Sequence, residues 1–130
     1  MSFDVQWDND EKTVLRFAAG ERWDWNEFHK RMRLSQFMLD RVDHPVEAII
    51  DLSQSVKMPA GAVGHLRSLG KQDHPNRTPR IVIIGVDPTL RQQLGSADGV
   101  YRTPTQLIRF VSSDTDARRI IAEWQRDHDS

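Results

Sequence analysis

The 130-residue sequence contains no cysteine. This absence excludes disulfide bonds, thiolate zinc sites, iron–sulfur ligation and a cysteine nucleophile, and it agrees with a reducing compartment. A charge excess is also lacking, because 18 Lys and Arg residues stand against 19 Asp and Glu residues, for a formal net charge of −1. Such a balance gives no general attraction to nucleic acid or to an anionic membrane, so we expect no nucleic-acid partner.

Long hydrophobic runs are missing as well. No apolar run reaches the about 18 residues of a membrane-spanning helix, and residues 1–6 carry neither a basic nor an apolar targeting segment. We therefore expect a cytoplasmic protein without membrane insertion. The composition, 38% hydrophobic and 28% charged, is that of a globular domain. The length predicts a single domain over residues 1–130, with a core from about residue 4 to residue 126.

What the sequence does contain is a succession of strand-like and helix-like patterns. Alternating apolar residues on either side of the polar segment 8–11 predict an antiparallel hairpin over residues 3–17. Apolar residues then follow at helical spacing, which predicts a helix over about residues 24–42. Asp24 suits its N-cap, and Pro45 favours an end shortly before it.

Two short segments, residues 46–52 and 80–86, are rich in branched apolar side chains. Strands that are apolar on both faces are typical of the middle of a sheet that is covered on both sides. The segment between them predicts a helix that begins at Pro59 and ends at Gly70. A strand–helix–strand unit of this kind places its two strands side by side and parallel.

The rest of the chain predicts three more elements. Asp87 and Pro88 suit the start of a short helix, residues 106–111 form a strand pattern, and Ser113 has capping-box spacing to Asp116 for a final helix. The expected order is β-β-α-β-α-β-α-β-α. It corresponds to an α/β sandwich, in which helices pack on a mostly parallel central sheet with an N-terminal hairpin.

The search for catalytic and metal-binding motifs gives little. The five histidines form no i, i+4 pair, and no complete serine elbow or phosphate loop occurs, so we expect no metal site and no cofactor. Asp51 and Asp87 follow the two central strands, at the ends where open α/β sheets bind ligands, and an enzyme would use them as acid and base or to hold a cation. The alternative, which we favour, is that Asp51 closes a turn with Ser53 and Asp87 caps a helix.

A family resemblance lies in residues 48–66, which read AIIDLSQSVKMPAGAVGHL, together with residues 81–85, which read IVIIG. These segments resemble a STAS domain of the anti-sigma-factor-antagonist type. More closely, they are similar to the divergent bacterial branch that is grouped with STAS and Sec14-like sequences. The likeness in element order covers roughly residues 4–126. It implies a STAS-like fold and a regulatory or protein-interaction module without a catalytic centre.

The resemblance also implies where the working edge lies. In switching members of the family, the helix after the third strand opens with Asp-Ser-Ser-Gly, and the second serine is phosphorylated. This chain has Met58-Pro59-Ala60-Gly61 at those positions, so the glycine is kept and Ala60 replaces the acceptor. We therefore expect no serine phosphoswitch at this helix.

The same region is apolar, which suits a constant protein contact or a small apolar ligand better than a phosphate. The candidate rim comprises Ser53, Ser55, Val56, Met58, Pro59, Ala60, Gly61 and Val63. Leu34, Phe37 and Met38 fall outside the main stripe of the first helix, and they either extend this rim or form a separate candidate homodimer face. The alternative is that all these apolar residues are ordinary core residues.

The leading expectation is a non-enzymatic STAS-like module in bacterial regulation, which forms a homodimer and binds a protein partner that the sequence does not identify. A second hypothesis is a carrier of a small apolar or lipid-like ligand beside residues 56–63. The enzyme that uses Asp51 and Asp87 is the third.

Overall fold

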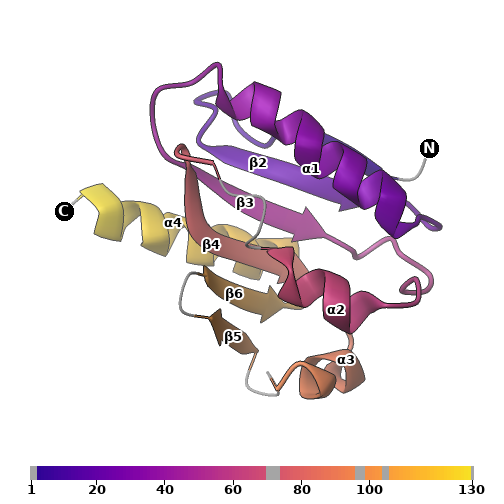
Figure 1. Ribbon diagram of the computed structural model, residues 1–130. Helices are drawn as coiled ribbons and strands as arrows, with labels where there is room; N and C mark the ends of the chain where they lie inside the picture. Colours follow the sequence, from indigo (N-terminus) through magenta and orange to yellow (C-terminus); the bar gives the residue numbers. More distant parts are fainter. Residues whose placement is uncertain (1–2, 70–73, 96–98, 104–105, 130) are drawn as a thin grey trace.

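The computed structural model describes residues 3–69, 74–95, 99–103 and 106–129. These residues form six strands and four helices, in one sheet with helices on both faces (Figure 1). In chain order the elements are β1 (Phe3–Trp7), β2 (Val14–Ala19), α1 (Trp25–Leu39), β3 (Val46–Asp51), α2 (Ala62–Arg67), β4 (Arg77–Ile84), α3 (Pro88–Gln93), β5 (Val100–Thr103), β6 (Gln106–Val111) and α4 (Asp114–Asp129).

The sheet has the strand order β1-β2-β3-β4-β6-β5. The four strands β2, β3, β4 and β6 are parallel, and β1 and β5 pair antiparallel at the two edges. The parallel pairing of β3 with β4 confirms the expected arrangement of the two branched segments. Because the parallel strands follow one another in a single direction, α1, α2 and α3 pack on one face and α4 on the other.

Two hydrophobic cores lie on the two faces of the sheet. The larger one packs under α1, α2 and α3, and the smaller one packs under α4. β3 contributes Ala48 and Ile50 to the larger core and Ile49 to the smaller, and β4 alternates in the same way. Residues 48–50 of β3 and 81–84 of β4 are therefore continuously apolar, because each face of the sheet is covered there. Each described helix is too short or too polar to cross a lipid bilayer.

Polar side chains fix the first elements as predicted. In the β1–β2 turn, Asn9 Oδ1 accepts from the backbone N–H groups of Thr13 (3.0 Å) and Val14 (3.3 Å). Before α1, the Asp24 carboxylate accepts from the backbone N–H of Glu27 (2.8 Å). Each of these bonds satisfies backbone donors that the turn or the helix start leaves unpaired.

The starts of the last two helices also agree with the sequence. Asp87 accepts from the backbone N–H of Leu90 (2.9 Å), and Pro88 is the first residue of α3. Ser113 Oγ accepts from the backbone N–H of Asp116 (3.1 Å) at the start of α4. The capping predictions made from these short patterns are confirmed.

The end of α1 lies earlier than the predicted residue 42. The helix ends at Leu39, because the Asn76 side chain donates to the carbonyl oxygens of Leu39 (3.0 Å) and Val42 (2.9 Å). Asn76 comes from the loop before β4, so this cap depends on the tertiary fold. Residues next to α1 in the sequence carry no signal for it.

The predicted start of α2 at Pro59 is wrong. The helix begins at Ala62, and Gly61 precedes it with a φ of 87°, a left-handed conformation that glycine adopts without strain. The Pro59 carbonyl oxygen instead accepts from the indole N–H of Trp25 (3.3 Å). Gly70, the predicted C-terminal cap, lies outside the described residues.

The other differences concern the strands. β4 covers Arg77–Ile84 rather than residues 80–86. Its register against β3 shifts between Val46 and Ala48, and this irregular stretch accommodates Pro79, which has no N–H to donate. β5 was not predicted, because it is an edge strand of 4 residues without an alternating pattern. The chain order therefore gains one strand before α4.

Replacing Gly85 by alanine should destabilise the fold. Gly85 has a φ of 90°, and a Cβ there would lie 3.0 Å from the backbone nitrogen of Ser53. We expect Gly85→Ala to lower the free energy of unfolding by about 2 kcal/mol, because both the conformation and the contact involve backbone. In the control Gly64→Ala the new Cβ meets nothing within 4 Å. Because position 64 lies inside a helix, alanine there should raise the free energy of unfolding by about 0.5–1 kcal/mol. Urea unfolding of both variants measures the difference, and a Gly85→Ala protein as stable as wild type contradicts this account.

Candidate functional site

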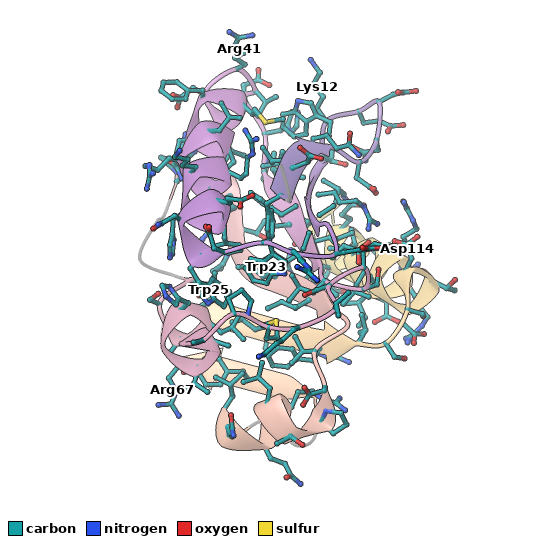
Figure 2. All side chains as sticks on the ribbon, turned by 90° about the vertical axis from the view of Figure 1, so that its right-hand side faces the viewer. Lys12, Trp23, Trp25, Arg41, Arg67 and Asp114 are labelled. Atoms are coloured by element: carbon teal, nitrogen blue, oxygen red, sulfur yellow. The ribbon has the colours of Figure 1, made fainter. Side chains whose placement is uncertain are left out.

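The four parallel strands have their carboxyl ends on the same side of the sheet, and this side is called the carboxyl edge. The loop after β3 and the first residues of α2 lie at this edge, and together they form the rim, residues 53–63. Figure 2 looks onto the edge and places Trp25 between α1 and α2, with Asp114 at the start of α4. The edge therefore brings together segments that are far apart in the sequence.

Three hydrogen bonds attach the rim to the segment that leads into α1. They are Val56 N–H to the Glu21 carbonyl oxygen (2.9 Å), Trp23 Nε1–H to Ser55 Oγ (2.8 Å) and Trp25 Nε1–H to the Pro59 carbonyl oxygen (3.3 Å). The two indoles also pack edge to face, with ring centroids 4.7 Å apart. The loop thus rests on a buried aromatic cluster that also contains Phe3 and Phe28.

A groove of about 430 Å³ separates the rim from α3. Its lining includes Met58, Pro59 and Val63 from the rim and Thr89, Leu90 and Gln93 from α3. Gly61 and Ala62 also lie at this groove, whereas the predicted rim residues Ser53, Ser55, Val56 and Ala60 lie outside it. The structure therefore brings together about half of the predicted rim in one concave surface.

The rim residues differ in how far they are exposed. Val56 is 75% exposed, and Ser53 and Ala60 are exposed as well. Met58 and Val63 are partly buried and pack against the larger core. The alternative that the whole region is ordinary core therefore holds in part for Met58 and Val63 and does not hold for Val56.

Sequence reasoning missed the α3 wall of the groove. Thr89, Leu90 and Gln93 carry no local pattern that points to a site, and they face the rim only because β4 lies next to β3. The sequence did predict that these two strands are neighbours. Helices that follow neighbouring parallel strands start close together, so the expected closeness of the α2 and α3 starts was the one signal for these residues.

The candidate homodimer face on α1 is only partly exposed. Phe37 is 66% exposed and Leu34 is 42% exposed. Met38 is partly buried and packs against the larger core, so it does not share their outward face.

The two carboxylates considered for catalysis are each engaged within the chain. Asp51 accepts from the backbone N–H (2.9 Å) and the hydroxyl (2.6 Å) of Ser53, and from Arg16 (3.0 Å). Asp87 accepts from the backbone N–H of Leu90 at the start of α3. Both carboxylates make the hydrogen bonds that the structural alternative expects of them.

Arg16 joins three elements on the α4 side of the carboxyl edge. Its guanidinium donates to the carboxylates of Asp8 (2.8 Å), Asp51 (3.0 Å) and Asp114. Arg118 on α4 donates to Asp8 (2.7 Å) and Asp114 (2.7 Å) in turn. The side chains of Arg16 and Asp8 are only 10% and 8% exposed, so this network ties the hairpin and β3 to the first turn of α4.

The network also sets protonation at the start of α4. Burial favours the neutral form of Asp114, but hydrogen bonds from Arg118 and Arg16 outweigh it and hold the pKa of Asp114 below its usual value. The pKa of Arg16 is raised: burial opposes the shift, and the bonds to Asp8 and Asp114 produce it. Arg16, Arg118 and Asp114 are therefore charged at neutral pH.

A histidine pair lies beside the rim, between α1 and α2. His29 Nε2 and His65 Nδ1 are 2.9 Å apart, and the His65 ring stacks on Trp25 at 4.5 Å between centroids. Burial, followed by the electrostatic influence of His65 and Arg33, lowers the pKa of His29. A hydrogen bond between the rings requires one nitrogen without a proton, so the pair holds at most one positive charge while the bond exists.

The comparisons with known proteins add no assignment. No protein-family model, no curated protein and no solved structure matches the chain. Within the described residues, no group of three or more histidine or carboxylate side chains is arranged to hold a metal ion.

Removing the guanidinium of Arg16 should cost far more than removing an exposed one. Arg16→Met leaves the buried Asp8 carboxylate with Arg118 alone, and we expect a loss of about 3 kcal/mol in the free energy of unfolding. Arg119→Met is the matched control. Arg119 pairs with Asp116 and Glu123 but is 59% exposed, so its loss should cost no more than about 1 kcal/mol. Equal urea midpoints for the two variants would show that the network is not a main support of the fold.

Acid should weaken the fold through His29. Its pKa in the folded chain lies below the ordinary value of 6.5. The unfolded chain therefore takes up the proton first as the pH falls, and the free energy of unfolding decreases below about pH 6.5. His29→Gln keeps a hydrogen-bonding side chain that does not titrate, so it should remove part of this decrease. Urea unfolding between about pH 5 and pH 8 compares the two proteins, and identical pH profiles contradict the assignment.

Proposed function

We propose that this chain is a non-enzymatic STAS-like interaction module in bacterial regulation, and that its rim docks an apolar segment of a protein partner. The groove between the rim and α3 carries the proposal. Among its described lining residues Asp87 is the only charged one, and its carboxylate already caps α3. A groove without a free charge suits an apolar side chain better than an ionic substrate.

The attachment of the rim supports the same function. The three hydrogen bonds to the segment before α1 hold the loop in place without a partner. A surface that is ordered before binding loses little conformational entropy when a partner docks. Val56, which is 75% exposed two residues before Met58, extends the apolar surface beyond the groove.

The hydroxyl groups of the rim argue for docking that does not depend on phosphorylation. The position that matches the family's acceptor serine is Ala60, which has no hydroxyl. Ser55 Oγ already accepts from Trp23, and Ser53 Oγ donates to Asp51. The proposed contact is therefore constitutive.

A second function uses the same groove. Its volume of about 430 Å³ falls within the roughly 300–1,000 Å³ of small-molecule sites. A carrier of a small apolar or lipid-like ligand therefore remains the alternative proposal.

Native mass spectrometry of the protein purified gently from its own cells distinguishes the two. The protein-docking proposal expects a complex of defined stoichiometry, and Val56→Asp and Met58→Glu should each reduce its yield at least about tenfold, because a charge in an apolar contact must be desolvated. Thr115→Asp, on the exposed first turn of α4, is the control and should leave the complex intact.

The other outcomes decide against protein docking. An adduct of several hundred daltons that Met58→Glu removes identifies the carrier. A free monomer, or a complex that survives both rim variants, contradicts the proposed use of the rim. Far-UV circular dichroism and urea midpoints of all variants confirm that each one folds.

A further inference from the structure

The outer face of α1 carries two large apolar side chains that stay exposed in the described chain. Phe37 is 66% exposed and Leu34 is 42% exposed. They are three residues apart on a helix, so they point to the same side. Val56, on the rim, is the other strongly exposed large apolar residue of the described chain. The face of α1 is therefore a second apolar surface, separate from the groove.

Three positive charges surround this apolar pair. Lys30, Arg33 and Arg41 are exposed. Helical spacing places Lys30 and Arg33 on the same side of α1 as Leu34 and Phe37, and Arg41 follows the end of the helix. Arg41 projects from the end of α1 away from the rim (Figure 2). Together these five residues form the α1 face.

None of the three cations forms an ion pair within the described residues. Some other basic residues of the chain are engaged: Arg31 donates to the Phe3 carbonyl oxygen (2.7 Å), and Arg16 and Arg118 bind carboxylates. Asp40, on the flank of α1, accepts from His74 (2.7 Å). In a chain with a formal net charge of −1, the α1 face is therefore a local concentration of available positive charge.

We propose that the α1 face binds an acidic segment of a protein partner, in which Asp or Glu residues flank a large apolar side chain. The apolar residue packs on Phe37 and Leu34, and the carboxylates pair with Lys30, Arg33 and Arg41. Aromatic and arginine side chains dominate the binding energy of many interfaces, and this face offers both. The opposite charges steer the encounter and select against basic partners.

The charges favour this occupant over a second copy of the chain. In a two-fold dimer the same face meets itself, so the three cations of one copy come close to those of the other, and the face supplies no carboxylate to pair with them. Like charges in a contact weaken it. A lipid surface fits this face less well, because two apolar side chains on a helix that is packed against a sheet offer little area for insertion.

A randomised peptide library tests the proposal on the whole protein. Peptides of about 16 residues are long enough for about four helical turns. We expect the selected peptides to carry net negative charge and at least one large apolar residue. Their binding should weaken as salt rises from about 0.05 to 0.3 M, because exposed charges are screened.

Variants then locate the site with one selected peptide, labelled for fluorescence anisotropy. We expect Phe37→Ser and the double variant Arg33→Glu/Arg41→Glu each to lower its affinity at least about tenfold, or about 1.4 kcal/mol. Val56→Ser on the rim and Arg126→Glu at an exposed position of α4 are the controls and should change it less than about twofold. All four changes are at exposed positions, and urea midpoints verify that the folds are equally stable.

Several results overturn the proposal. It is contradicted if no peptide is selected or if the selected peptides lack net negative charge. It is also contradicted if Val56→Ser lowers the affinity for the peptide and Phe37→Ser does not. Light scattering that finds a dimer which Phe37→Ser disrupts assigns the face to a second copy. Co-sedimentation with phosphatidylglycerol vesicles that Phe37→Ser abolishes assigns it to a membrane.

Discussion

Two strands that are apolar on both sides, β3 and β4, impose the layered arrangement of this protein. Their side chains alternate between the two faces of the sheet, so each face needs a cover. The parallel strands are added in one direction, which places three connecting helices on one face and leaves the other to α4. The same order brings the starts of α2 and α3 together, and the groove lies between them.

Much of this arrangement could be read from periodicity and capping residues. The hairpin, the two central strands, the final strand and the four helices follow from local patterns, because burial alternates with a period of two in strands and 3.6 in helices. Features that depend on distant residues could not be read in this way. Asn76 shortens α1 from a loop far along the chain, and β5 exists only because β6 offers it an edge.

The candidate site was predictable to a similar extent. The loop after β3 was found through its apolar composition and its family resemblance, and Met58 and Val63 do line the groove. Its opposite wall required the strand order, and the support by Trp23 and Trp25 required knowledge of which loop they reach. Exposure on α1 was predicted for Met38 as well as Phe37, because helical spacing alone does not show how far the core extends around a helix.

The ion pairs between the first hairpin and the last helix have a consequence for synthesis on the ribosome. Asp8 and Arg118 are 110 positions apart, and α4 alone covers its face of the sheet. While the chain is being made, that apolar face has no cover until α4 emerges, and Asp8 lacks its bonds to Arg118. The nascent sheet is therefore vulnerable to association with other chains until α4 has packed on it.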